Sequence, residues 1–154
     1  MESKLKLPPR IKVLEALGSI ADKRFIVLDE KRMKVISSER DKEYFVYLDL
    51  EKNIVYSDDN GTKLKGYIGY PIIVFLMIKG ILPFNERIAN ALSGIHWKRL
   101  NEKYKNYYIV EKIIKNILKK KGIEEKEVEE FINEVMKKIS SLSLFLDLKI
   151  KERD

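Results

Sequence analysis

The spacing of hydrophobic residues changes along this chain, and that change restricts the fold more than any other feature of the sequence. From residue 24 to residue 57, apolar and polar residues tend to alternate, which is typical of strands with one buried face. From residue 71 to residue 139, apolar residues recur every three or four positions, which is typical of amphipathic helices. We therefore predict an α+β fold in which the strands and most of the helices occupy separate parts of the chain.

The first part of the chain is expected to contain one helix and a small antiparallel meander. Pro8-Pro9 precede a helical stripe over residues 11–21, and Pro9 suits the first turn of that helix. Short polar or charged connections favour a meander of three to four strands, drawn from residues 25–29, 32–37, 43–50 and 53–57. The segment 58–62, Asp-Asp-Asn-Gly-Thr, then predicts a turn or loop.

The second part of the chain predicts a bundle of about five helices and a last strand. Residues 71–79 are apolar on every face, which is typical of a central buried helix. Residues 142–150 alternate strictly, so we expect this segment to return to the sheet. The chain is interpreted as a single domain (1–154) with a helix-plus-sheet half (1–65) and a mainly helical half (66–154). The other predicted helices cover residues 86–92, 97–105, 107–121 and 124–139.

Composition excludes several classes of protein. A chain of 154 residues that is 45% hydrophobic can bury one core and is not intrinsically disordered. Without cysteine it has no disulfide and no thiolate ligand, and its longest apolar run, residues 70–78, is far shorter than the ~20 residues of a membrane span. We expect a cytoplasmic location. Glutamine is absent while lysine, glutamate and isoleucine are abundant, which resembles proteins of hyperthermophiles, so we expect a thermophilic, archaeal source.

The excess positive charge lies in one stretch, the basic segment, residues 96–121. It holds nine lysines and arginines against two glutamates, so it carries +7, the formal net charge of the whole chain. On a helix, part of this segment presents a lysine face opposite an apolar face. Such a face can neutralise the phosphates of DNA or RNA, although solvation alone also explains it. The predicted nucleic-acid contacts are Lys98, Arg99, Lys103, Lys105, Lys112, Lys115 and Lys119.

A second pattern in this region supports nucleic-acid binding. Residues 88–100 resemble a helix-turn-helix in outline, with Gly94 at the turn and Ile95 and Leu100 seating the second helix. The polar residues of the second helix would then face a groove. Ser93 makes the turn one residue longer than the usual pattern, and short helices joined by a glycine turn are common in helical domains.

Three hypotheses about function follow. The first is a non-enzymatic nucleic-acid-binding module that uses the basic segment. The second is a protein-interaction or self-associating domain, a homo-oligomer joined through residues 142–150 if they form an unpaired edge strand. The third is an enzyme that acts on a phosphorylated or nucleotide substrate through Asp58, Asp59 or His96.

The sequence supports no catalytic residue, metal ligand or cofactor. His96 is the only histidine and has no identifiable partner, and a zinc site is not expected with one histidine and no cysteine. The carboxylates of Asp58 and Asp59 fail the pattern of a calcium loop, and residues 66–71 lack the lysine and hydroxyl of a phosphate-binding loop. Aromatic residues of the strands, which could stack on single-stranded bases, are interpreted as core: Tyr44, Phe45, Tyr47 and Tyr56.

Overall fold

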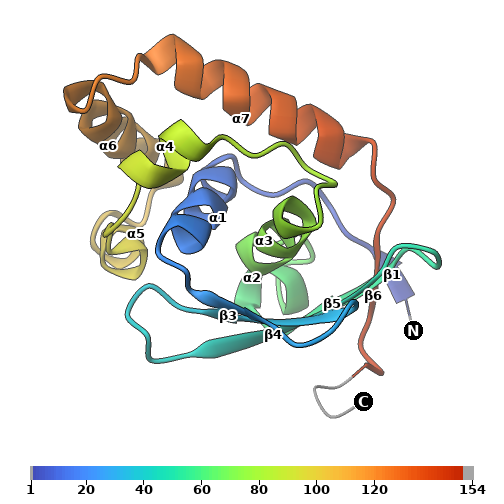
Figure 1. Cartoon of the computed structure of the whole chain (residues 1–154). Helices are drawn as coiled ribbons and strands as arrows, with labels where there is room; N and C mark the ends of the chain where they lie inside the picture. Colours follow the sequence, from blue (N-terminus) through green and yellow to red (C-terminus); the bar gives the residue numbers. More distant parts are fainter. Residues whose placement is uncertain (1, 151–154) are drawn as a thin grey trace.

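The structure is a computed structural model that describes residues 2–150, in which seven helices lie over one face of a six-stranded mixed sheet (Figure 1). This confirms the α+β prediction. The strands are β1 (Glu2–Lys4), β2 (Phe25–Val27), β3 (Arg32–Ile36), β4 (Glu43–Asp49), β5 (Ile54–Ser57) and β6 (Phe145–Asp147). The helices are α1 (Ile11–Ala21), α2 (Asn60–Lys63), α3 (Tyr70–Ile78), α4 (Glu86–Ala91), α5 (Trp97–Tyr104), α6 (Tyr107–Lys120) and α7 (Glu125–Ser140).

The sheet has the order β1-β6-β5-β4-β3-β2. Strands β2 to β5 form the predicted antiparallel meander, and β6 returns to the sheet as predicted, parallel to β5 and antiparallel to β1. The prediction of a nine-residue strand over 142–150 was too long, because only three residues of this segment meet a partner strand. The neighbouring strand β1 was not predicted. Since β6 is paired on both sides, it is not the free edge that the self-association hypothesis required.

The hydrophobic core lies between the sheet and the helices, and it includes residues from both halves of the chain. Helices α1 and α3 pack against each other, and α3 also contacts β3 and β4 (Figure 1). Helices α4, α6 and α7 contact α1 on its other sides. Because α3 is enclosed all round, residues 71–77 are all buried, which explains why that segment is apolar on every face.

Asparagine side chains fix the starts of two helices in the second half. Asn85 Oδ1 accepts from the Ile88 amide at 2.9 Å at the start of α4, and Asn106 Oδ1 accepts from the Ile109 amide at 3.1 Å at the start of α6. Each bond satisfies an amide that the first turn of a helix leaves unpaired. A side-chain cap also begins α2, where Asp59 is the capping residue. This short helix lies inside the segment that was predicted as a turn or loop.

Ion pairs attach the last two long helices to the segment before α1. Arg10 Nη2 lies 2.6 Å from Glu129 Oε1 of α7, and Arg10 Nε lies 3.6 Å from Glu111 of α6. Lys115 contacts the same two glutamates, at 2.8 Å from Glu111 Oε2. The hydrogen bond from Lys115 holds the pKa of Glu129 below its usual value, and Arg10 adds to this. The cluster is therefore charged and internally neutralised at physiological pH.

Candidate ligand-binding cavity

A cavity of about 440 Å³ opens where α1 and α5 meet one end of the sheet. Its walls come from α1, α5, α3, the start of α2, strand β4, the segments on either side of β2 and β3, and the residue after α5. The chain brings together residues separated by more than ninety positions to form these walls. The lining residues are Lys12, Glu15, Ser19, Arg24, Ser37, Ser38, Lys42, Tyr44, Asn60, Tyr70, Trp97, Lys98, Asn101, Glu102 and Lys105.

The wall between α1 and α5 depends on a close approach at Gly18. A Cβ atom placed at this position would lie 2.8 Å from Trp97 Nε1. Glycine therefore lets the indole ring lie directly against the backbone of α1, where Trp97 is 4% exposed. This contact fixes the start of α5 and with it the side of the cavity that α5 provides.

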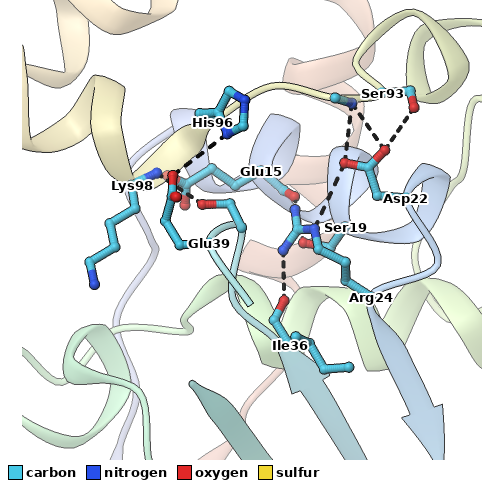
Figure 2. A network of polar contacts seen from close by, with 11 residues as sticks. Glu15, Ser19, Asp22, Arg24, Ile36, Glu39, Ser93, His96 and Lys98 are labelled. Carbon is cyan, nitrogen blue, oxygen red and sulfur yellow. Dashed lines mark hydrogen bonds and ion pairs between the residues drawn. The ribbon is translucent and has the colours of Figure 1, made fainter. Parts of the chain in front are cut away.

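Arg24 is the most unusual residue of the cavity, because it is a cation that is only 2% exposed. Figure 2 shows its two interactions: Nη1 donates to the Ile36 carbonyl at 2.7 Å, and Nε lies 3.8 Å from Asp22 Oδ2. Asp22 is itself held by the Ser93 hydroxyl at 2.7 Å and the Gly94 amide at 3.0 Å. Among the described residues, the buried Nη2 of Arg24 has no hydrogen-bond partner.

Three more buried polar atoms of the cavity have no hydrogen-bond partner in the described part of the chain. Two belong to α5, the donor Trp97 Nε1 and the acceptor Asn101 Oδ1, and the third is Glu15 Oε2, whose contact is an ion pair with Lys12. The amide nitrogen of Asn101 donates to Glu15 Oε1 at 2.6 Å, which fixes the side chain with its oxygen unpaired. Buried polar groups in native proteins are nearly always paired, so these atoms, gathered in one cavity, call for an explanation.

A buried ion pair from α1 also lines the cavity. Glu15 is 3% exposed, and its Oε2 lies 2.9 Å from Lys12 Nζ. Burial by itself would lower the pKa of Lys12, but the adjacent Glu15 carboxylate more than reverses this and raises the pKa. The Lys12 ammonium is therefore charged at neutral pH and pairs with Glu15.

Two tyrosines supply neutral hydroxyl groups to the cavity. Burial raises the pKa of Tyr70 and, to a smaller extent, that of Tyr44, so neither ionises near neutral pH. Their rings meet edge to face, with centroids 6.1 Å apart. The cavity thus combines flat aromatic surfaces with groups that donate hydrogen bonds.

The electrostatics of the cavity favour an anion. Five of its lining residues are cationic and two are carboxylates. Lys12 is neutralised by Glu15, and Lys98 Nζ lies 2.9 Å from Asp41 outside the lining. The remaining lining charges are Arg24, which also lies near Asp22, two exposed lysines, Lys42 and Lys105, and one exposed carboxylate, Glu102, which leaves a small positive excess.

The structure divides the seven predicted nucleic-acid contacts into two groups. Lys98 and Arg99 pair with the β3–β4 loop, at 2.9 Å from Asp41 and 3.2 Å from Glu39, and Lys115 belongs to the cluster around Glu129. The other four are exposed, and no ion pair of theirs appears among the described residues: Lys103, Lys105, Lys112 and Lys119. Two of the seven, Lys98 and Lys105, line the cavity.

The helix-turn-helix outline corresponds to α4 and α5, with Gly94 in the left-handed region at φ +83°. The expected packing of the first helix is confirmed, since Ile88, Ala89 and Leu92 are fully buried. The polar side of α5, however, contacts the rest of the chain. The Lys98 amide donates to Ser38 Oγ at 3.0 Å, and Asn101 contacts α1. In this arrangement α5 forms a wall of the cavity.

The three residues proposed for an enzyme, Asp58, Asp59 and His96, make separate contacts in the structure. His96 is largely exposed, with Nδ1 3.6 Å from Glu39 (Figure 2). Asp58 accepts from the Phe45 amide at 2.9 Å, whereas Asp59 is buried in the cap of α2. The described residues contain no group of three histidine, cysteine or acidic side chains placed to hold a metal ion. None of the helices in residues 2–150 has the length and apolar character needed to cross a bilayer.

The fold and the cavity define a class: an α+β protein whose helices cover one face of a mixed sheet, with a basic, partly aromatic cavity beside α5. The chain belongs to the family described as uncharacterised conserved protein UCP014422, whose model matches residues 5–145. Comparisons with curated proteins and with solved structures gave no significant match. Glu15, Arg24 and Trp97 all lie inside the matched range.

Sequence reasoning missed the cavity. The sequence marks Arg24 only as the point where the hydrophobic spacing changes, and it gives Trp97 no place in a binding site. One signal was available: Glu15 lies between Leu14 and Ala16 in a helix whose residues 13–19 are all buried. A carboxylate in so apolar a helix requires a buried partner.

Proposed function

We propose that this chain is a binding protein for a small organic anion, which occupies the cavity between α1 and α5. The observation that carries the proposal is the buried guanidinium of Arg24, whose Nη2 has no hydrogen-bond partner in the described part of the chain. Burying a charged group whose hydrogen bonds are only partly satisfied costs free energy, because its lost hydration is not fully compensated. A ligand carboxylate or phosphate would supply the missing acceptor and offset that cost.

The other lining residues narrow the class of ligand. The cavity volume of about 440 Å³ lies within the usual range for small-molecule sites. Trp97 Nε1 and Asn101 Oδ1 offer one donor and one acceptor, and Tyr44 and Tyr70 offer ring surfaces. We therefore expect an organic phosphate or carboxylate that also carries a flat ring with hydrogen-bonding groups.

Trp97 provides a direct test, because it is the only tryptophan in the chain and it lines the cavity. Ligand binding should change its fluorescence without any added label. The probes are inorganic phosphate, nucleoside monophosphates, sugar phosphates and aromatic carboxylates, each with its uncharged parent compound. We expect a saturable change with at least one ring-bearing anion at micromolar concentrations, and at least a tenfold weaker response to its uncharged parent.

Two outcomes would contradict this proposal. One is the absence of a saturable change for every anion class, combined with no rise in melting temperature at millimolar concentration. The other is equal binding of the charged ligand and its uncharged parent, since the Arg24 guanidinium would then play no part in recognition.

Nucleic-acid binding is the second candidate function, and one observation favours it. Lys105, Lys112 and Lys119 are exposed, and no ion pair of theirs appears among the described residues. They remain available to phosphates, whereas Lys98, Arg99 and Lys115 already pair with carboxylates. This surface shares only Lys105 with the cavity, so reversing Lys112 and Lys119, which do not line it, separates the two functions by experiment.

Replacing Lys105, Lys112 and Lys119 by glutamate tests the nucleic-acid proposal. Fluorescence anisotropy with duplex DNA, single-stranded DNA and RNA, each titrated with salt, measures the effect. We expect the triple variant to bind at least ~10-fold more weakly, with a shallower salt dependence because each lost phosphate contact removes about 0.7–0.9 from the slope. The matched control reverses Lys52, Lys63 and Lys137, which are also exposed but lie outside the basic segment. Equal loss in both triple variants, or no binding by the unmodified protein at low salt, would exclude this surface.

A further inference from the structure

The outer edge of the sheet at β2 carries apolar side chains that the described residues leave uncovered. β2 is the last strand in the sheet order and pairs only with β3. Ile26, Val27 and Leu28 are 46%, 51% and 47% exposed. Soluble proteins usually protect an edge strand with charges, proline or a covering element, and these three consecutive positions have no such protection.

The backbone of β2 is ready to accept another strand. Arg24 accepts from the Ile36 amide at 2.8 Å, and Leu28 donates to the Arg32 carbonyl at 3.0 Å. In an antiparallel pair the residues alternate between bonding to the partner strand and pointing away from it. The backbone N–H and C=O groups of Ile26 therefore point toward β3, as do the Arg24 carbonyl and the Leu28 amide. The backbone N–H and C=O groups of Phe25 and Val27 point away from β3, toward the open edge of the sheet.

We propose that β2 pairs with β2 of a second copy of this chain, antiparallel about a twofold axis at Ile26. In this register Phe25 lies opposite Val27 of the second copy, and the reverse pair follows by symmetry, so all the outward-facing peptide groups of both residues are used. The segment is thus complementary to itself in backbone pattern and apolar character, as a symmetric interface requires.

The interface is short, so the association is weak. It joins three residues from each chain, whereas stable dimers bury about 1,600 Å². We expect a dissociation constant on the order of tens of micromolar, which favours dimers in concentrated solution only. The proposal is independent of the cavity, because apart from Arg24 none of these residues lines it.

Sedimentation analysis from about 5 µM to 500 µM, a range chosen to bracket that constant, tests the proposal. Ile26→Lys places two like charges together on the axis, and Val27→Pro removes an amide that is not used in the β2–β3 pairing. Each should weaken dimerisation at least tenfold. Leu64→Lys is the matched control, because Leu64 is 74% exposed at a site away from the edge, and it should leave the dimer unchanged. Melting curves verify that each variant is folded.

Amide hydrogen exchange is a second measurement, and it uses the unmodified protein, so it does not depend on whether a variant folds. As protein concentration rises, exchange at Phe25 and Val27 should slow, whereas the Leu28 amide, already bonded to β3, should not change. A protein that stays monomeric throughout the concentration range would overturn the proposal. So would a dimer that persists in both Ile26→Lys and Val27→Pro, or one that leaves the exchange of Phe25 and Val27 unaltered.

Discussion

The Arg24→Met variant is expected to bind the anionic ligand of the cavity about 10- to 150-fold more weakly than the unmodified protein. The estimate rests on the ~1.5–3 kcal/mol of a hydrogen bond to a charged group. Methionine matches the length of the apolar part of arginine and fills similar space, so the cavity should keep its shape. Trp97 fluorescence titration measures the change. The uncharged parent compound should bind the variant and the unmodified protein alike.

The same substitution should cost little stability, and this contrast distinguishes a binding residue from a structural one. Methionine loses the 2.7 Å bond to the Ile36 carbonyl, but it also removes a cation that is 2% exposed and incompletely paired. The Asp22 carboxylate left behind keeps its hydrogen bonds to Ser93 and Gly94, so the substitution leaves no unpaired buried charge. We expect the free energy of unfolding to change by less than about 1 kcal/mol, which corresponds to a shift of about 2–4 °C in Tm.

Two controls complete this experiment. Arg24→Lys retains the charge but loses the planar fork of donors, so its affinity should lie between the two. Arg87→Met makes the same chemical change at an exposed arginine that pairs with Glu127, outside the cavity, and should leave ligand affinity unchanged. A large loss of stability in Arg24→Met with unchanged affinity would show that Arg24 has a structural role alone.

The Gly69→Ala variant should lose about 2–4 kcal/mol of unfolding free energy, because the new methyl group has no space and would break buried hydrogen bonds. A Cβ at this position would lie 2.1 Å from Asp59 Oδ2 and 2.7 Å from Thr62 Oγ1. Those atoms belong to a buried network. Asp59 accepts from the Ser57 hydroxyl at 2.5 Å and the Thr62 amide at 3.0 Å, and the Gly69 amide donates to Thr62 Oγ1 at 3.1 Å.

Gly80→Ala is the matched control, since it tests backbone conformation without crowding. Gly80 has φ +76° with no atom within 4 Å of an added Cβ, so only the left-handed backbone is penalised, by about 1–2 kcal/mol. Gly69, the N-cap of α3, has an ordinary φ of −74°. Denaturant unfolding compares the two. A smaller loss for Gly69→Ala than for Gly80→Ala would mean that Asp59 moves aside at little cost.

A double-mutant cycle locates the clash. Asp59→Ser keeps a side chain that can cap α2 but shortens it, which makes room beside residue 69. We expect Gly69→Ala to cost less in the Asp59→Ser background than in the unmodified protein, by at least about 1 kcal/mol. Additive losses would show that the methyl group disturbs another part of the molecule.

These two sites show where sequence reasoning stops. The segment containing Asp58 and Asp59 was predicted as a turn or loop, and the structure places the cap of the short helix α2 there. That Asp59 is buried against Gly69 depends on how closely α3 approaches the end of β5, and no local pattern records that distance. Likewise, Arg24 is an ordinary basic residue in the sequence. It becomes unusual only because α1, α5 and β3 enclose it.

What the sequence determined by itself is the secondary structure with repeated local signals. The buried helix over residues 71–79, the meander and the positions where α4 and α6 begin follow from hydrophobic spacing, because this signal acts between near neighbours. The tertiary structure alone decided that β6 inserts between β1 and β5, that α5 forms a wall of the cavity, and that Lys98, Arg99 and Lys115 are paired with carboxylates. Each depends on contacts between residues far apart in the chain, and these contacts form only when the whole fold is packed.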